Sequence, residues 1–147
     1  MDRMVLETSI RKAFSNTPMP TGKLTDVGYD EGAQDYFEGT DWQSHDAKGL
    51  RTQDAAMHYF TPAAFRYYLP AYMLAEIINP EEADILGEYV LNQLSDQFIV
   101  DVVKSRNRFL QFSNAERAAI LEFIRYMEET YGELDVQFHI LNEVFCS

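Results

Sequence analysis

The sequence predicts an all-α protein, an irregular bundle of six or seven helices that forms a single domain over residues 1–147. Three observations support this class. Apolar residues recur at every third or fourth position along much of the chain, as on the buried face of a helix. Capping residues followed by proline or by acidic residues mark several helix starts. The apolar fraction of 46% is typical of a globular domain rather than of a disordered chain.

The N-terminal third is expected to hold two helices separated by a loop. An amphipathic stripe predicts a helix from about Arg3 to Phe14, and the prolines and the glycine of Ser15 to Thr25 predict a loop. A short acidic helix is expected over Asp30 to Glu38, ended by Gly39. Trp42, the one tryptophan, follows in a loop and is expected to fill a gap in the core.

The middle of the chain is expected to hold consecutive helices. The first should run from Thr52 to Phe60. Thr61 is then a favoured N-cap, and Pro62 suits the first position of a second helix. This second helix is expected to reach Leu69, where Pro70 either kinks it or begins a further helix.

The same kind of start signal recurs at Asn79-Pro80, where two acids follow at the positive end of the helix dipole. A helix is expected from there to about Leu94 or further. Residues Gln97 to Val103 are rich in β-branched side chains, so they are compatible with a short strand as well as with a helix. The helix is favoured because a lone strand would lack a pairing partner.

The C-terminal part is expected to hold two helices. Ser113-Asn114-Ala115-Glu116 is a capping box that opens a helix, and Gly132 should close it. A last helix is expected from Glu133 to Phe145, since apolar residues recur through it at helical spacing.

The segment from Tyr59 to Met73 has six aromatic residues in fifteen and a single charge, Arg66. A helix with this composition is apolar nearly all round, so we expect it to be the central helix, with internal partners for Arg66 and for the tyrosine hydroxyls. An aromatic-lined groove is the functional alternative.

Part of this segment carries a family resemblance. The stretch Phe60 to Tyr72 fits the pattern F-T-P-x-A-F-R-Y-Y-L-P-A-Y. Together with Tyr36-Phe37, Trp42 and the Phe112 to Arg117 stretch, it resembles an uncharacterised family of small, mostly bacterial acidic proteins, a domain of unknown function. The resemblance covers roughly Tyr36 to Tyr126 and implies no catalytic residues.

The charge of the chain is strongly acidic, with 24 acids, 12 bases and a net charge of −12. Such a surface repels phosphate backbones and anionic lipid, so we expect neither a nucleic-acid nor a membrane partner. It attracts a basic protein. Cys146, the one cysteine, allows no intrachain disulfide, and the first residues show no signal peptide, so a cytoplasmic protein is expected.

No pattern in the sequence is typical of an active site. We find no phosphate-binding glycine loop, no nucleophile elbow and no cysteine or histidine cluster, and no cofactor is expected. His45 could join Asp41 or Asp46 at a metal, but a surface polar role near Trp42 is favoured. His58 and His139 stand beside apolar residues and are expected to be partly buried.

The function predicted from these features is that of a non-catalytic acidic binding protein, in particular an immunity-type inhibitor that caps a basic toxin or enzyme. The alternatives are a metal-assisted hydrolase that uses clustered carboxylates, such as Asp35, Glu38 and Asp41, and a structural or adaptor subunit that uses the basic patch of Lys104, Arg106 and Arg108. The predicted binding residues are Asp30, Glu31, Asp35, Tyr36, Glu38, Asp41 and Trp42.

Overall fold

The computed structural model describes residues 2–26, 28, 32–97 and 99–146, and over these ranges the chain is helical, without a β-strand. An isolated bridge joins Thr25 to Phe60. The helices are α1 (Arg3–Ala13), α2 (Ala33–Phe37), the 3-10 helix η1 (Trp42–Ser44), α3 (Ala47–Arg51), α4 (Ala56–Tyr59), α5 (Pro62–Ile78), α6 (Pro80–Ala83), α7 (Leu86–Leu94), α8 (Val102–Leu110), α9 (Asn114–Tyr131) and α10 (His139–Phe145).

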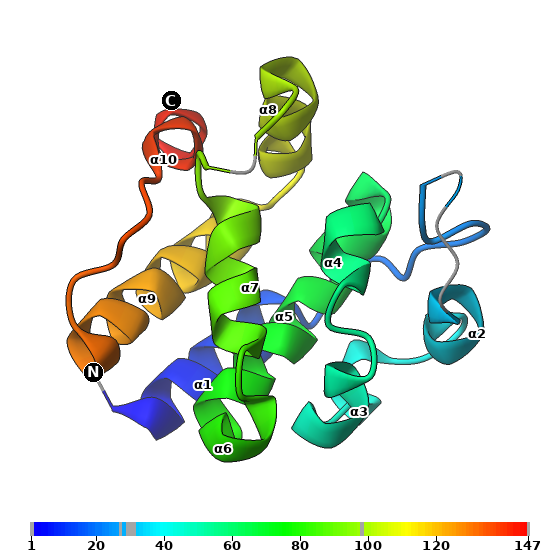
Figure 1. The fold of residues 1–147 in the computed structure, drawn as a ribbon, viewed down its shortest axis with the longest axis horizontal. Coiled ribbons are helices and arrows are strands. Elements are labelled where there is room, and N and C mark those ends of the chain that lie inside the picture. The colour runs from blue at the N-terminus through cyan, green and yellow to red at the C-terminus, as the bar shows by residue number, and fades with distance from the viewer. Residues whose placement is uncertain (1, 27, 29–31, 98, 147) are drawn as a thin grey trace.

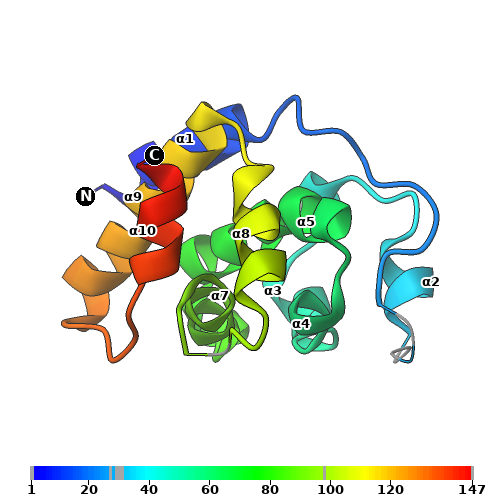
Figure 2. The same ribbon diagram turned by 90° about the horizontal axis from the view of Figure 1, so that it is seen from above.

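The all-α prediction is therefore confirmed. Within the described ranges, the helices of seven residues or more are α1, α5, α7, α8, α9 and α10, and the others are short connecting helices. Helix α5 packs against α1, α3, α6 and α7, while α1 also packs along α9 and α8 packs against α10 (Figures 1 and 2). Helix α2 lies at the opposite end of the molecule from α9 and α10 in both views.

Helix α5 is the centre of the core, as its composition predicts. From Ala64 to Ile77, all of its residues except Arg66 are buried. The Thr61 side chain accepts the N–H of Ala64 at 3.3 Å, so the expected N-cap is present. Pro70 lies inside the helix and no new helix begins there. Burial of apolar surface on all sides offsets the hydrogen bond that a proline cannot donate.

Three further expectations are also confirmed. Arg66 has its internal partner, since its Nε donates to Glu116 Oε1 at 2.9 Å. Ser113 and Glu116 form the complete capping box at the start of α9. Helix α9 ends before Gly132, whose φ of 88° is a conformation that side chains disfavour.

The helix expected from Thr52 to Phe60 is present only in part, because α4 covers Ala56–Tyr59 and residues 52–55 form turns. Helix α3 begins earlier, at Ala47, because the Asp46 side chain accepts the N–H of Gly49 at 2.8 Å and caps it. Helix α3 then ends at Arg51, and α4 begins only at Ala56.

The helix expected from Asn79 to Leu94 is interrupted. The backbone of Asp84 has a φ of 52°, which ends α6 and turns the chain into α7. The Asn79 amide does not cap the helix backbone but donates to Glu82 Oε2 at 3.1 Å.

The two remaining helix starts lie later in the chain than expected. Gln97 to Val103 forms neither a full helix nor a strand in its described part, and α8 begins at Val102 with Asp101 as its N-cap. Helix α10 begins at His139 rather than Glu133. Asp96, which follows α7, accepts the first backbone N–H groups of α10, with Oδ2 3.1 Å from the backbone nitrogen of His139. Because this cap is distant in sequence, local patterns do not reveal it.

Within the described ranges, no helix is both long enough and apolar enough to cross a bilayer.

Candidate functional site

The predicted binding stretch is an exposed acidic surface, as far as the structure describes it. Asp30 and Glu31 lie outside the described residues. Asp35, Glu38 and Asp41 are exposed, and Asp41 also caps η1 by accepting the N–H of Gln43 at 2.8 Å. Neither Asp35 nor Glu38 has an ion-pair partner among the described residues.

The aromatic residues of this stretch lie beneath the acids. Trp42 is only 3% exposed and meets Phe14 edge-on, with 6.4 Å between ring centroids, so it fills the core as expected. The half-buried Tyr36 stacks on His45, with 5.1 Å between their ring centroids. The Tyr36 hydroxyl lies against Gly49, where a Cβ would collide with it. The carboxylates therefore lie above a layer of packed aromatic rings.

His45 belongs to that aromatic layer, which corrects the expectation that it has a surface role. Its Nε2 lies 2.8 Å from Thr40 Oγ1, and its ring is packed between the aromatic rings of Tyr36, Phe37 and Tyr68. Burial lowers the pKa of His45, while the nearby carboxylates act in the opposite direction. The neutral imidazole is thus favoured, as suits a packed histidine.

The other two histidines are exposed, so the expectation that they are partly buried is wrong. His58 is exposed at the end of α4. The side chain of His139 is 79% exposed and lies 3.3 Å from Asp96. Among the described residues, no group of three His, Cys, Asp or Glu side chains is placed to hold a metal ion.

The basic patch expected near α8 is occupied within the chain. Lys104 pairs with Asp26 at 3.3 Å, and Arg106 pairs with Glu143 at 2.7 Å. The Arg108 guanidinium lies 3.4 Å above the Phe65 ring centroid, and burial lowers the pKa of Arg108 to about 9. These three bases do not form one free cationic surface.

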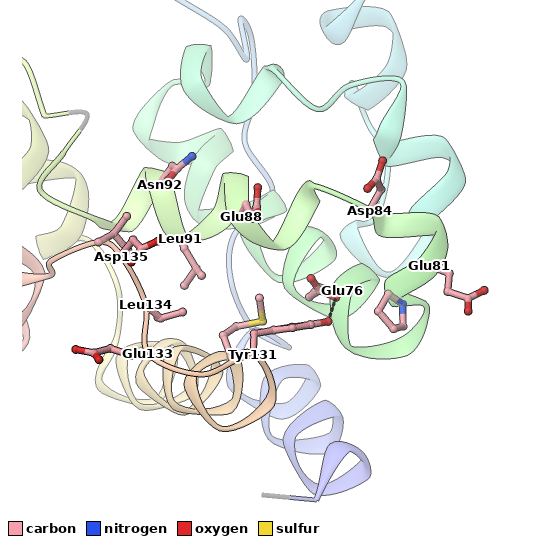
Figure 3. A pocket seen from close by; sticks show the side chains of 13 residues that line it. Glu76, Glu81, Asp84, Glu88, Leu91, Asn92, Tyr131, Glu133, Leu134 and Asp135 are labelled. Atoms are coloured by element: carbon pink, nitrogen blue, oxygen red, sulfur yellow. Dashed lines mark hydrogen bonds between the residues drawn. The ribbon is translucent and has the colours of Figure 1, made fainter.

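A pocket of about 620 Å³, which was not predicted from the sequence, opens between the α6–α7 region and the end of α9. Figure 3 shows Tyr131 reaching across it from α9 to Glu76, while Leu91 and Leu134 face each other at the far end. Its other acidic lining residues are Glu81, Asp84, Glu88, Glu133 and Asp135. No lysine, arginine or histidine is among the described residues that line it.

Glu76 is the chemically unusual residue of this pocket. It is 4% exposed, and its Oε2 accepts a hydrogen bond from the Tyr131 hydroxyl at 3.3 Å. Burial raises the pKa of Glu76 to about 7, the bond from Tyr131 opposes this, and Glu88 adds to the rise. A carboxyl with such a pKa in a pocket is typical of binding and catalytic sites, although structural networks also produce it.

The position of Glu76 depends on a glycine. Gly87, in the first turn of α7, faces the Glu76 side chain on α5. A Cβ at Gly87 would collide with Glu76 Oε1 and would lie 2.8 Å from its Cδ. The missing side chain at Gly87 is therefore what gives the carboxyl its place.

The sequence held one signal for this site. Glu76 is the single charged residue of the buried part of α5 that follows Arg66, and no base occurs between Tyr67 and Val103. A buried acid in such a segment has no base close to it in the sequence. The contributions of Gly87 and Tyr131 come from two other helices and could not be predicted locally.

Together these features define an all-α single domain with an acidic surface and a pocket built around one buried carboxyl. The family of unknown function DUF6714 matches residues 2–144, and the chain belongs to this family. The resemblance noted in the aromatic segment is confirmed, and it extends over nearly the whole chain. Comparison with curated proteins and with solved structures finds no match.

Proposed function

We propose that this protein is a non-catalytic acidic binding protein whose partner is a basic protein, in particular an immunity-type inhibitor that caps a basic toxin or enzyme. The contact surface is the acidic stretch around α2 and η1. Its residues are Asp30, Glu31, Asp35, Tyr36, Glu38 and Asp41. Trp42, which the sequence also predicted as a binding residue, is buried beneath them and does not form part of the surface.

The observation that supports the proposal most directly is that two acids of this surface, Asp35 and Glu38, have no basic partner among the described residues. Several bases are already paired elsewhere, as in Arg51 with Asp84 and Arg66 with Glu116. Asp35 and Glu38 have no such ion pair with the described residues. A basic partner would supply the missing charge.

The physics of such a contact is electrostatic steering followed by docking. A net charge of −12 accelerates the encounter with a basic protein, and the effect weakens as salt is added. Rim carboxylates act mainly on the association rate. Tyr36 adds apolar contact at the surface, and the buried Trp42 keeps the acidic segment rigid from below.

The proposal places the protein in the cytoplasm of a bacterium. The lone Cys146 favours a reducing compartment, because small proteins of oxidising compartments tend to pair their cysteines.

Purification of the whole chain from its native host at low salt, followed by mass spectrometry, tests the proposal. We expect a stoichiometric basic partner whose enzymatic or toxic activity falls when the chain is added. The dissociation constant should rise with sodium chloride concentration. Recovery of no stoichiometric partner at low or moderate salt, or of an acidic one, would contradict the proposal.

Matched variants locate the surface. The double variant Asp35→Asn/Glu38→Gln should bind the partner at least about tenfold more weakly at low salt. The control Glu122→Gln/Glu128→Gln changes the net charge equally, but on α9, which lies far from α2 in both views. Equal weakening by the two variants would remove the α2 surface from the proposal.

A further inference from the structure

The pocket around Glu76 combines charge at one end with apolar walls at the other. Leu91, Met127 and Leu134 provide apolar surface, and Glu76 provides a carboxyl next to the Tyr131 hydroxyl (Figure 3). Its volume of about 620 Å³ lies in the range of small-molecule sites. A bare ion would leave the apolar walls unused, whereas an organic ligand would cover them.

Glu76 lacks a partner of opposite charge. It forms no ion pair with the described residues, and Tyr131 occupies only its Oε2. For its Oε1, which lies over Gly87, the described residues supply no hydrogen-bond donor. Buried carboxylates are costly unless they are paired, so a carboxyl in the pocket wall with one oxygen lacking a donor favours a ligand that brings a donor from outside the chain.

The surroundings select a cation as that donor. Asp84 lines the same pocket but is paired with Arg51, whereas Glu81 and Glu88 line it and form no ion pair with the described residues. Their combined potential draws cations and repels anions. Ammonium and guanidinium groups carry both the positive charge and the N–H donors that Oε1 requires.

We propose that this pocket binds an organic monocation, an ammonium or guanidinium group on a short apolar chain, with the charge against Glu76 and the chain against Leu91 and Leu134. Glu76 is the binding residue, and Gly87 is a positioning residue that acts through it. The inference is independent of the proposed function, because it concerns another surface and other residues. The cation can come from a free amine or from a basic side chain of a protein.

The test is a titration of the whole chain with small probes at pH 8 and low salt. Binding is monitored through the amide chemical shifts in ¹H–¹⁵N NMR spectra. The probes are n-butylguanidinium, n-butylammonium and the neutral n-butanol. We expect saturable shifts at Gly87, Leu91 and Leu134 with both cations, and at least about tenfold weaker binding of n-butanol, as for the loss of one charged hydrogen bond. This comparison uses the unaltered protein, so it stands even where a variant folds poorly.

Variants then identify the residue responsible. Glu76→Gln keeps the side-chain shape and should weaken n-butylguanidinium binding at least tenfold while n-butanol binding stays unchanged. Glu38→Gln removes one charge elsewhere and should leave the cation affinity within about twofold. A second pair of probes, acetylarginine amide and free n-butylguanidinium, shows whether a protein side chain or only a free amine enters.

Three results of these titrations would each overturn the proposal, and a competition with Mg²⁺ adds a fourth. The three are equal affinity for n-butanol and the cations, unchanged cation affinity in Glu76→Gln, and shifts confined to the Asp35–Asp41 surface. Displacement of the cations by low concentrations of Mg²⁺ would also overturn it, in favour of a metal. Because Glu38 and Glu76 are varied separately, loss of partner binding and loss of cation binding remain distinguishable.

Discussion

Glu116 on α9 accepts the Nε of Arg66 from α5 at 2.9 Å, and the same oxygen accepts the backbone N–H of Ser113 at 2.7 Å. Its second oxygen accepts the hydroxyl of Thr17, which follows α1. Glu116 is 1% exposed, so this one carboxylate joins three segments inside the molecule. Arg66 is needed mainly because the buried Glu116 carboxylate would otherwise lack a compensating charge.

The first prediction follows from that geometry. Glu116→Ala should lower the free energy of unfolding by about 3–5 kcal/mol, because it removes the capping box and leaves Arg66 without its anion. Glu116→Gln keeps an acceptor and should cost about half as much. Urea denaturation measures both costs. The control is Glu128→Ala on the same helix, which should lower the free energy of unfolding by less than about 0.5 kcal/mol. Equal costs at Glu116 and Glu128 would mean that the ion pair is not structural.

The second prediction concerns pH. The folded pKa of Glu76 is raised to about 7 from an unfolded value of 4.5. Between these values the folded protein holds a proton that the unfolded chain has released, so the contribution of Glu76 to stability is full below pH 4.5 and is lost as pH rises toward 7. At about 1.4 kcal/mol per unit, the loss is on the order of 3 kcal/mol.

Comparison with Glu76→Gln isolates this effect from the other acids of the chain. The difference in unfolding free energy between the protein and the variant should change across this window and be constant above pH 8. Urea denaturation at several pH values measures it. A difference that stays flat from pH 4 to pH 8 would show that Glu76 titrates normally.

The third prediction tests the fit between Gly87 and Glu76. Gly87→Ala places a Cβ within 2.9 Å of Glu76 Cγ, so one of the two must move. We expect a cost of about 1–3 kcal/mol from overpacking. In a Glu76→Ala background the obstacle is gone, and the same change should cost less than about 0.5 kcal/mol or even stabilise, since alanine favours helices. Additive costs in the double-mutant cycle would contradict the contact.

Much of the fold could be predicted because its helix ends are encoded locally. Thr61 before Pro62, the capping box at Ser113 and the glycine at 132 are short-range signals, and each one marks a true boundary. The errors occur where a boundary depends on something else. The turn at Asp84 needs a positive φ that no neighbouring residue announces, and α10 is capped by Asp96 from a distant segment.

The candidate sites divide in the same way. The acidic stretch around Asp35 is contiguous, so its exposure could be anticipated from composition alone. The pocket joins Glu76, Gly87 and Tyr131 from α5, α7 and α9, and only the packing of these helices brings them together. Sequence shows a lone acid in an apolar helix, but it does not show which residue leaves room for it.

The last prediction uses the one tryptophan of the chain as a probe. Trp42 is 3% exposed and packs edge-on against Phe14, so its fluorescence should be that of a buried indole and should resist quenching by acrylamide. Trp42→Ala should cost about 3–5 kcal/mol in urea denaturation, since it leaves a large cavity. Trp42→Phe should cost less and should leave binding of the basic partner within about threefold, because the carboxylates above it remain. Loss of partner binding in a well-folded Trp42→Phe protein would instead mean that the indole leaves the core to make the contact.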